Sequence, residues 1–468
     1  MSIIIPANSA VSGDFTAANS LMFNYADGAY LNRTLGTPTN NIKWTWSTWI
    51  KRSKITAAVQ RIFFAVNGSD EYTTIQFDDE YRLQWFNQIV GATDMQLITT
   101  RKFRDSSAWM HLVFVYDSAN ATAADRQIIY VNGERQTAFL DENTAGSNVT
   151  TAINQAVVHN IASGPGAQKF YGGYMAEVVF TDGQALAVTD VGEFDEDSGI
   201  WKPKSVSGLT FGNNGFYLDF QDSSALGNDA VGSNNFTANN LAATDQGIDT
   251  CTNNFCTMNP LDNYYSAATF SNGNNTVATA AAPVNWVAST FQVNKGKWYA
   301  ECKPTAGTGS ALVGFAGSTS KNSTQILETA GFFGGNYVNN GEYFFNGSGG
   351  AYASSFANGD IISVYLDLDN NFVYFAKNGV LQNSGVPTSG ATGTGGKAIT
   401  AAALTTNGGY AFACGDGNTA TRTFDWNFGS PYFAISSGNA DGNGYGNFEY
   451  AVPSGYFALC TKNLAEYG

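Results

Sequence analysis

The sequence has few charged residues, only two histidines and no long apolar run. Charged side chains make up 13% of its 468 residues. No stretch of about 20 apolar residues is present, so the sequence predicts no membrane-spanning helix. Its first ten residues, MSIIIPANSA, lack the basic residues and the apolar core of a secretory signal peptide. We therefore expect a protein that is not inserted into a membrane and is not exported by the usual secretory route.

Positive charge is scarcer than negative charge. The 23 Lys and Arg residues are outnumbered by 38 Asp and Glu residues, which gives a net charge of −15 at pH 7. A surface of this sign repels nucleic-acid phosphates and anionic membranes, and the basic residues form no cluster that would offset the repulsion. The composition therefore argues against a nucleic-acid partner.

Cysteine is also rare, and its spacing matches no known chemical motif. The sequence contains five cysteines: Cys251, Cys256, Cys302, Cys414 and Cys460. The odd number and the absence of a Cys-x-x-Cys pair favour a reduced protein assembled in the cytoplasm, with a Cys251–Cys256 disulfide as the alternative. The motifs of zinc sites, serine hydrolases and P-loop proteins are absent as well. We predict no catalytic residue and expect that the protein is not an enzyme.

The few residues with catalytic potential have structural explanations. His111 alternates with apolar neighbours as in a strand, and His159 lies near the end of a predicted strand. The string EFDED, residues 193–197, resembles the Glu-x-Asp-x-Glu series of some sandwich-fold glucanases, which leaves a glycan depolymerase as a weaker alternative. Its third carboxylate is Asp197 rather than a glutamate, and the string lies in a turn-rich segment. We expect a solvated acidic loop there.

What the sequence does contain is typical of β-structure. Aromatic residues reach 14%, glycine reaches 51 residues, and the periodicities of amphipathic helices and of coiled coils are missing. In residues 43–51, Trp44, Trp46, Thr48 and Ile50 alternate with Thr45, Ser47 and Trp49, which is the period of a strand in a sandwich. The pattern predicts an all-β protein of two antiparallel, jelly-roll β-sandwiches.

Two segments share the same order of strand and turn signals. Residues 359–380, GDIISVYLDLDNNFVYFAKNGV, predict three strands with an Asn-Gly turn before the third, and residues 112–136 repeat this order with a longer first loop. The acidic stretch DLDNN could also suggest a calcium loop. However, the positions that require Gly and Glu in an EF-hand hold Phe372 and Asn378, so we interpret it as a turn.

Changes in composition divide the chain into four predicted parts. A chain of this length is too long to fold around a single hydrophobic core, and the residues that predict strands cluster in two regions. We predict an N-terminal arm (1–20), a first sandwich (21–189), a turn-rich connector (190–262) and a second sandwich (263–468).

Aromatic residues beside amides suggest carbohydrate binding, because proteins stack sugars on rings and hydrogen-bond their hydroxyl groups. The predicted ligand-binding residues are Trp85, Asn87, Gln88, Tyr264, Tyr265, Phe332, Tyr337 and Tyr343. Packing in a sandwich core is the alternative for each aromatic ring. We predict no cofactor other than a structural calcium ion, for which the candidate ligands are Asp78, Asp79 and Glu80.

An ordered series of segments resembles the virion proteins of tailed bacteriophages. The segments SLMFNYADGAYLNRT, KWTWSTWIKRS and RDSSAWMHLVFVYDS resemble the laminin-G/concanavalin-A-like domain of these proteins. The resemblance continues through AEVVFTDGQAL and FDEDSGIWKPK. The region from GKWYAECKP to GYFALCTKNL is similar to their SPRY-like domain, and the whole resemblance extends from about residue 20 to 463.

This resemblance implies a structural protein of a phage particle, assembled in the bacterial cytoplasm and exposed on the virion surface. Such proteins are often labelled tail-fibre or receptor-binding proteins, which implies recognition of host-surface carbohydrate, contacts with other virion proteins and a homo-oligomer, with a trimer favoured. The chain lacks the shaft repeats and heptads of a long fibre. A capsid or tail decoration or adaptor protein, anchored by residues 1–20, therefore remains the alternative.

Overall fold

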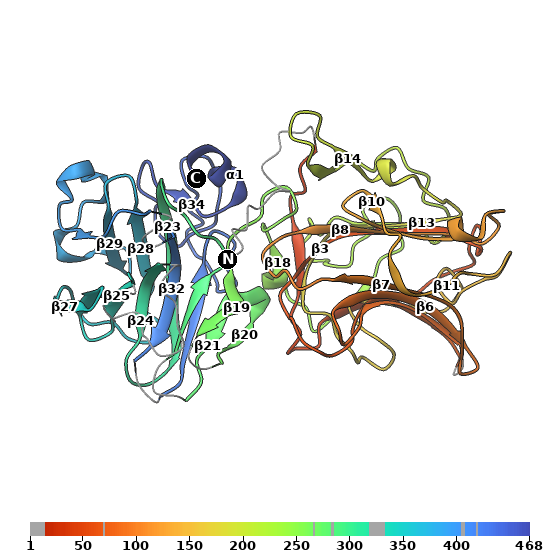
Figure 1. Ribbon diagram of the computed structural model, residues 1–468, viewed down its shortest axis with the longest axis horizontal. Coiled ribbons are helices and arrows are strands. Elements are labelled where there is room, and N and C mark those ends of the chain that lie inside the picture. Colours follow the sequence, from red (N-terminus) through yellow and green to blue (C-terminus); the bar gives the residue numbers. More distant parts are fainter. Residues whose placement is uncertain are drawn as a thin grey trace. The chain divides into compact units, whose positions relative to one another are not determined.

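The computed structural model describes residues 15–68, 71–264, 267–281, 285–317, 333–403, 408–417 and 420–468. The chain divides into two compact units, one from Ala7 to Thr252 and one from Asn253 to Gly468, and each is built from two antiparallel sheets (Figure 1). The α-helix in the described part is α1 (Thr461–Tyr467). No helix among these residues is long and apolar enough to span a membrane. The prediction of an all-β protein with two β-sandwiches is confirmed.

Sheet A of the first unit contains the longest buried strands. Its strands, in spatial order, are β10 (Glu134–Arg135), β9 (Gln127–Val131), β8 (Met110–Asp117), β3 (Lys43–Arg52), β13 (Gly173–Asp182), β1 (Ser20–Phe23) and β18 (Gln246–Gly247), and β16 (Phe216–Leu218) also pairs with β13.

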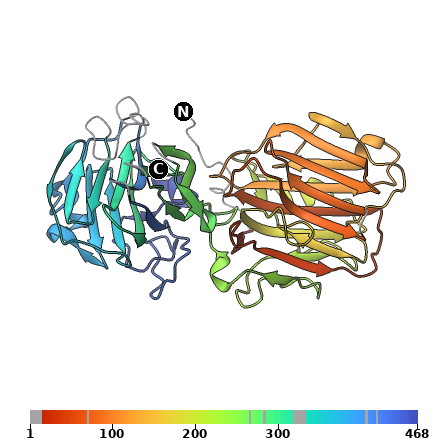
Figure 2. The ribbon, with the colours of Figure 1, turned by 90° about the horizontal axis from the view of Figure 1, so that it is seen from below.

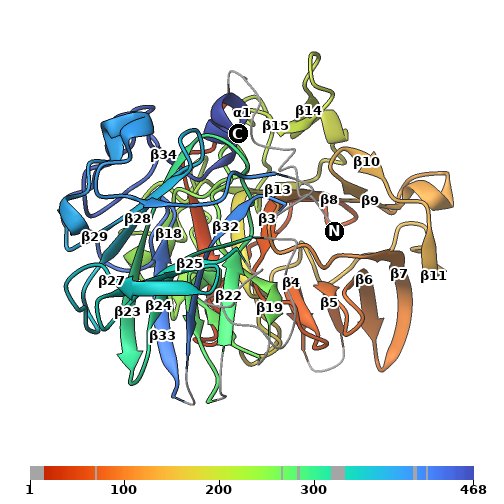
Figure 3. The same cartoon turned by 60° about the vertical axis from the view of Figure 1, so that its left-hand side comes forward.

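Sheet B of the first unit faces sheet A, and Figure 3 shows the two layers with β4 to β7 in one and β8 to β10 in the other. Its strands, in spatial order, are β11 (Phe139–Asn143), β7 (Ala92–Lys102), β6 (Arg82–Ile89), β5 (Glu71–Phe77), β4 (Gln60–Asn67), β12 (Val158–Ile161), β2 (Tyr30–Thr34) and β17 (Thr237–Asn239).

The core of the first unit follows the period-two pattern of these strands. Trp44, Trp46 and Ile50 of β3 lie on one face, as predicted, and this face points between the sheets, where the Trp46 ring stacks on Phe63 of sheet B at 4.9 Å. Burial of such rings supplies most of the favourable free energy of the sandwich, at roughly 25 cal/mol per Å² of apolar surface. The same alternation places every second residue of each strand on an outer face.

Residues 190–252, predicted as most of a connector, are part of the first sandwich. Three of their strands extend its sheets, since β16 pairs with β13, β17 with β2 and β18 with β1. β14 (Gly192–Phe194) and β15 (Trp201–Pro203) form a separate hairpin. Their short length and many turn residues weaken the strand signal in the sequence, and pairing to distant strands compensates for it.

The second unit is also a two-sheet sandwich. Sheet C contains β19 (Met258–Tyr264), β22 (Asn285–Ser289), β32 (Tyr410–Asp416), β24 (Leu312–Gly317), β25 (Gly335–Val338), β26 (Glu342–Phe345) and β27 (Ser348–Ala351). Sheet D contains β20 (Thr269–Ser271), β21 (Thr276–Ala278), β33 (Arg422–Asn427), β23 (Lys297–Gly307), β28 (Ile362–Asp367), β29 (Phe372–Lys377) and β30 (Val380–Leu381), with β31 (Lys397–Ala398) and β34 (Phe457–Ala458) paired to β29 and β23.

Both predicted three-stranded segments are confirmed. β28, β29 and β30 pair in sequence, and Asn378 and Gly379 have φ angles of 47° and 77°, as a type I′ turn requires. β8, β9 and β10 pair in the same way in the first unit. The acidic DLDNN stretch is a turn in which the Asp367 carboxylate pairs with Lys297 at 2.9 Å and accepts hydrogen bonds from Asn370.

Candidate functional site

The outer face of sheet A is covered by residues 184–211, which we call the covering segment. Val191 and Val206 of this segment pack on Val113, Val115 and Val179 of the sheet. The Trp201 ring lies over His111, and its Nε1 donates a hydrogen bond to His111 Nδ1 at 2.9 Å. This face is therefore closed to a ligand.

His111 has the structural role that the sequence predicted. It is stacked on Trp49 at 4.7 Å, and its Nε2 lies 2.7 Å from Ser47 Oγ. Burial lowers its pKa from 6.5 to about 3, so the ring stays neutral. Burial also lowers the pKa of His159, to about 4. Neither imidazole is exposed enough to act on a substrate.

The outer face of sheet B carries a row of three glutamines, Gln76, Gln84 and Gln96, which we call the amide row. They lie on the neighbouring strands β5, β6 and β7, where Leu83 and Leu97 point into the core instead. Figure 2 shows these strands face-on, and Figure 1 shows β6 and β7 curved along their length. Gln84 and Gln96 are partly exposed, so this face presents amides to solvent.

Hydrogen bonds orient every amide of the row in the same direction. Gln76 Nε2 donates to Gln84 Oε1 at 2.7 Å, and Gln84 Nε2 donates to Gln96 Oε1 at 3.3 Å. Arg61 Nε donates to Gln76 Oε1 at one end, and Gln96 Nε2 donates to Asp141 Oδ2 at the other. Gln76 Oε1 also accepts a hydrogen bond from Thr74 Oγ1 at 3.4 Å, so both of its lone pairs are used. Gln84 and Gln96 each keep a second N–H and a second lone pair, so these two amides can both donate to and accept from a polyhydroxylated ligand.

Three aromatic rings lie beside the amide row. The Phe64 and Tyr72 rings are 5.8 Å apart, and Phe86 meets Tyr72 edge-on at 5.6 Å. The guanidinium of Arg61 lies 4.6 Å from the centre of the Phe64 ring and 5.3 Å from that of Tyr72. Tyr72 is partly exposed, and its hydroxyl donates to Gln88 Oε1 at 2.5 Å. Amides and an aromatic ring thus share this face.

The three predicted ligand-binding residues of β6, Trp85, Asn87 and Gln88, do not all lie on the same face of the strand. Trp85 is 0% exposed and packs edge-on against Phe114 in the core, so its ring has no face for a sugar. Asn87 is also buried and accepts a hydrogen bond from Thr73 at 2.6 Å. Gln88 lies on the outer face. The sequence prediction missed Phe86 and Gln84, which the alternation of β6 places on that same face.

The predicted aromatic residues of the second unit do not form a shared surface in the described residues. Tyr337 is 0% exposed and Tyr343 6%, and both pack on Phe375 in the core. Tyr264 is the last residue of β19. Tyr265 and Phe332 lie outside the described residues.

The calcium candidates are engaged with basic side chains. Asp78 pairs with Arg82 at 2.7 Å, and Glu80 pairs with Lys102 at 3.0 Å, while Asp79 is exposed. In the described part of the chain, no group of three or more His, Cys, Asp or Glu side chains could hold a metal ion. A calcium ion would have to displace Arg82 from Asp78.

The acidic string 193–197 lies in the β14–β15 hairpin. Glu193 and Asp195 both pair with Lys202, at 3.4 and 3.3 Å, and Asp195 Oδ1 accepts hydrogen bonds from Ser198. These bonds and the Lys202 charge lower the pKa of Asp195. The carboxylates stabilise a hairpin and do not converge on a cleft. The five cysteines are free and buried, and no Cys251–Cys256 disulfide is formed.

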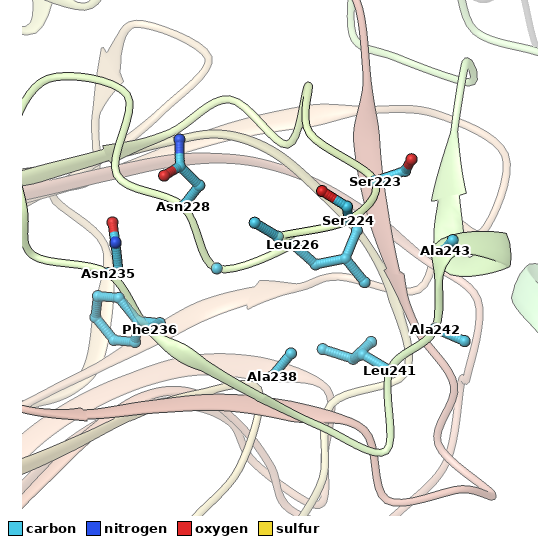
Figure 4. A pocket seen from close by; sticks show the side chains of 12 residues that line it. Ser223, Ser224, Leu226, Asn228, Asn235, Phe236, Ala238, Leu241, Ala242 and Ala243 are labelled. Atoms are coloured by element: carbon cyan, nitrogen blue, oxygen red, sulfur yellow. The ribbon is translucent and has the colours of Figure 1, made fainter.

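A pocket of about 370 Å³ lies between β16 and β18 (Figure 4). Leu226, Phe236 and Leu241 line it together with serines, alanines and the amides of Asn228 and Asn235, and none of the twelve lining residues is ionisable. Asn235 Oδ1 already accepts a hydrogen bond from the backbone of Asp229 at 2.9 Å. Few polar groups are left to orient a ligand, so the outer face of sheet B remains the stronger candidate site.

Family comparisons agree with this architecture. Residues 24–192 match the laminin-G model described as the concanavalin A-like lectin/glucanases superfamily, and residues 295–416 match the SPRY domain model. The chain therefore combines a concanavalin A-like domain with a following SPRY domain, both of which are β-sandwiches. No curated protein matches the sequence.

Several solved structures resemble parts of the chain. The SPRY domain of human HERC1 is 14% identical with a TM-score of 0.29, over 36% of this chain and 96% of that one. A heptameric SAP-like pentraxin from Limulus polyphemus is 14% identical with a TM-score of 0.30, over 43% and 94%. A proposed carbohydrate binding protein from Bacteroides ovatus is 16% identical with a TM-score of 0.32, over 47% and 58%. These matches are too distant to indicate a function.

Proposed function

We propose that this chain is a non-enzymatic protein of a bacteriophage virion that binds host-surface carbohydrate through the outer face of sheet B. The observation that carries the proposal is the amide row Gln76–Gln84–Gln96, whose hydrogen bonds run in one direction across three strands. The covering segment occupies the opposite face of the sandwich, so sheet B offers the remaining broad surface of the first unit. The phage context rests on the resemblance of the sequence.

The binding mechanism follows from the chemistry of this face. Sugar hydroxyl groups both donate and accept hydrogen bonds, and the oriented amides of Gln84 and Gln96 offer one free N–H and one free lone pair each. The partly exposed Tyr72 ring beside the row supplies an apolar surface for a sugar ring. A shallow face of this kind binds weakly, and many copies on one particle would convert weak binding into avidity.

The experiment is a glycan array probed with the full chain and with Gln84→Ala and Gln96→Ala. We expect specific glycans to be bound by the wild type and lost in both variants, while Gln136→Ala, a glutamine outside sheet B, binds normally. The bound glycan should be recovered intact, because no carboxylates converge on this face. Absence of any glycan binding would overturn the proposal.

The alternative is a capsid or tail decoration protein, anchored by residues 1–20. It predicts firm attachment to purified particles without glycan binding, and loss of attachment when residues 1–20 are deleted from an otherwise folded protein. Electron microscopy of the intact virion would locate the chain directly.

A further inference from the structure

Arg61, at one end of the amide row, is a buried cation that pairs with no carboxylate among the described residues. It is 4% exposed, and its Nη1 atom is buried without a hydrogen-bond partner. Burial lowers the pKa of Arg61 and Tyr72 partly offsets this effect, but no carboxylate of the described residues acts on it. This is notable in a chain with 38 acidic residues. Burying an unpaired charge costs free energy, which an anionic ligand would offset.

A second cation, Lys169, lies beside Arg61. Its backbone carbonyl accepts a hydrogen bond from the Arg61 backbone N–H at 2.9 Å. Burial, and to a smaller extent the charge of Arg61, lower the pKa of Lys169. Lys169 is exposed, so the pair joins a buried guanidinium to an accessible ammonium group. Two positive charges that no carboxylate of the described residues neutralises favour the binding of an anionic ligand nearby.

The guanidinium is held in a defined position. Its Nε donates a hydrogen bond to Gln76 Oε1, and its Cζ lies 4.6 Å from the centre of the Phe64 ring and 5.3 Å from that of Tyr72. A Cβ at Gly164 would lie 2.8 Å from Nη1, so the backbone can approach there because the residue is glycine. Asn160 Oδ1, on the neighbouring strand β12, is also buried without a partner. The unpartnered donor and acceptor thus lie at the same end of the face.

We propose that Arg61 and Lys169 bind the anionic group of an acidic glycan, a carboxylate or a sulfate, at the β4 end of the amide row. Arginine suits such groups because its planar fork makes two parallel, charge-assisted hydrogen bonds. Asp141 at the opposite end would repel an anion, so the acidic group lies toward β4 and neutral hydroxyl groups lie toward β11. The glycan identity rests on the proposed function, whereas the anion site does not.

The first experiment measures binding of glucuronate, glucose 6-sulfate and glucose to the full chain at constant ionic strength. We expect one or both anionic sugars to bind and glucose to bind much more weakly. Arg61→Gln should weaken anion binding about tenfold or more, and Lys169→Gln should weaken it less. The matched control is Arg101→Gln, which removes an exposed arginine stacked on Phe103 in the same sheet and should change nothing.

The outcomes separate this inference from the proposed function. Equal anion binding by all variants, or no anion binding by the wild type, would overturn the inference. Lys169→Gln keeps the test valid if Arg61→Gln does not fold, because Lys169 is exposed. A further outcome is measured with oligosaccharides. If Gln84→Ala abolishes their binding but the wild type does not prefer acidic over neutral glycans, the anion site is contradicted and the proposed function is not. Anionic monosaccharide binding without any oligosaccharide binding would support the anion site and contradict the proposed function.

Discussion

Trp201 Nε1 donates a hydrogen bond to His111 Nδ1 at 2.9 Å, and this contact joins residues that are 90 positions apart in the sequence. Because Nδ1 accepts this bond, the neutral imidazole carries its proton on Nε2, which then donates to Ser47 Oγ. The indole also fills the space above Gly133, where a Cβ would lie 2.4 Å from its ring. One tryptophan thus fixes the covering segment on sheet A and sets the tautomer of a buried histidine.

Replacing Trp201 should therefore loosen the covering segment. We expect Trp201→Ala to lower the free energy of unfolding by about 3–5 kcal/mol, because it removes a buried ring and leaves His111 Nδ1 without its donor. Urea unfolding would measure the change. Phe194→Ala, in the same hairpin but 50% exposed, should cost less than about 1 kcal/mol. Equal small effects of both variants would show that the covering segment contributes little to stability.

The buried ion pair between Lys51 and Asp249 gives a second stability prediction. Nζ and Oδ2 are 2.7 Å apart, both side chains are 1% exposed, and Asp249 also accepts a hydrogen bond from Trp109. Asp249→Asn keeps the shape but removes the charge that compensates Lys51, so we expect a loss of about 3–5 kcal/mol. Disruption of the more exposed Lys43–Asp117 pair by Asp117→Asn should cost less than about 1 kcal/mol in the same unfolding assay.

Glu177 makes the stability of the first unit depend on pH. It lies in β13 with a φ of 51°, and Tyr217 donates its hydroxyl hydrogen bond to the carboxyl group. Burial raises the pKa of Glu177 from 4.5 to about 8; the Tyr217 hydrogen bond opposes this rise, and the nearby Asp219 adds to it. Between pH 4.5 and about 8, the Glu177 carboxyl group therefore stays protonated in the native state, whereas the unfolded chain releases this proton.

The contribution of Glu177 to stability is complete below pH 4.5 and is lost as the pH rises toward 8. The loss should be roughly 1.4 kcal/mol per pH unit in that range. Glu177→Gln cannot ionise, so its unfolding temperature should rise relative to the wild type as the pH increases from 5 to about 8. A constant difference between the two proteins over this range would contradict the raised pKa.

The two faces of β6 should respond differently to mutation. Trp85→Ala should cost about 3–5 kcal/mol of stability, because it leaves a cavity in the core. Gln84→Ala should change stability by less than about 1 kcal/mol but abolish glycan binding on the array. Thermal unfolding and binding measured on the same preparations would separate these effects. A stable Trp85→Ala variant would mean that this core position tolerates a cavity.

The strands and tight turns could be predicted from sequence because they depend on local signals. Asn132-Gly133 and Asn378-Gly379 both adopt positive φ angles and join paired strands, as their side chains favour. The alternation of Lys43–Arg52 likewise divided the residues of β3 between its two faces, and the structure places Trp44, Trp46 and Ile50 in the core. It did not show that Trp49, on the other face, is buried too, because the ring that stacks on it is His111 of β8, which is 62 positions away in the chain.

The candidate site depended on information that is not local. Trp85, Asn87 and Gln88 were all predicted to bind a ligand, but a strand sends alternate residues to opposite faces. The amide row could not be predicted, because its glutamines become neighbours only through the register of β5, β6 and β7. The sequence also could not show that Arg61 has no carboxylate partner in the part of the chain that the structure describes.

The amino-acid sequence by itself determined the all-β class, the two sandwiches and the type I′ turns, because side-chain alternation and turn chemistry act over a few residues. Only the tertiary structure decided which outer face is closed and which carries the amide row. That choice depends on contacts between segments far apart in the chain, such as the hydrogen bond from Trp201 to His111, which joins residues 90 positions apart.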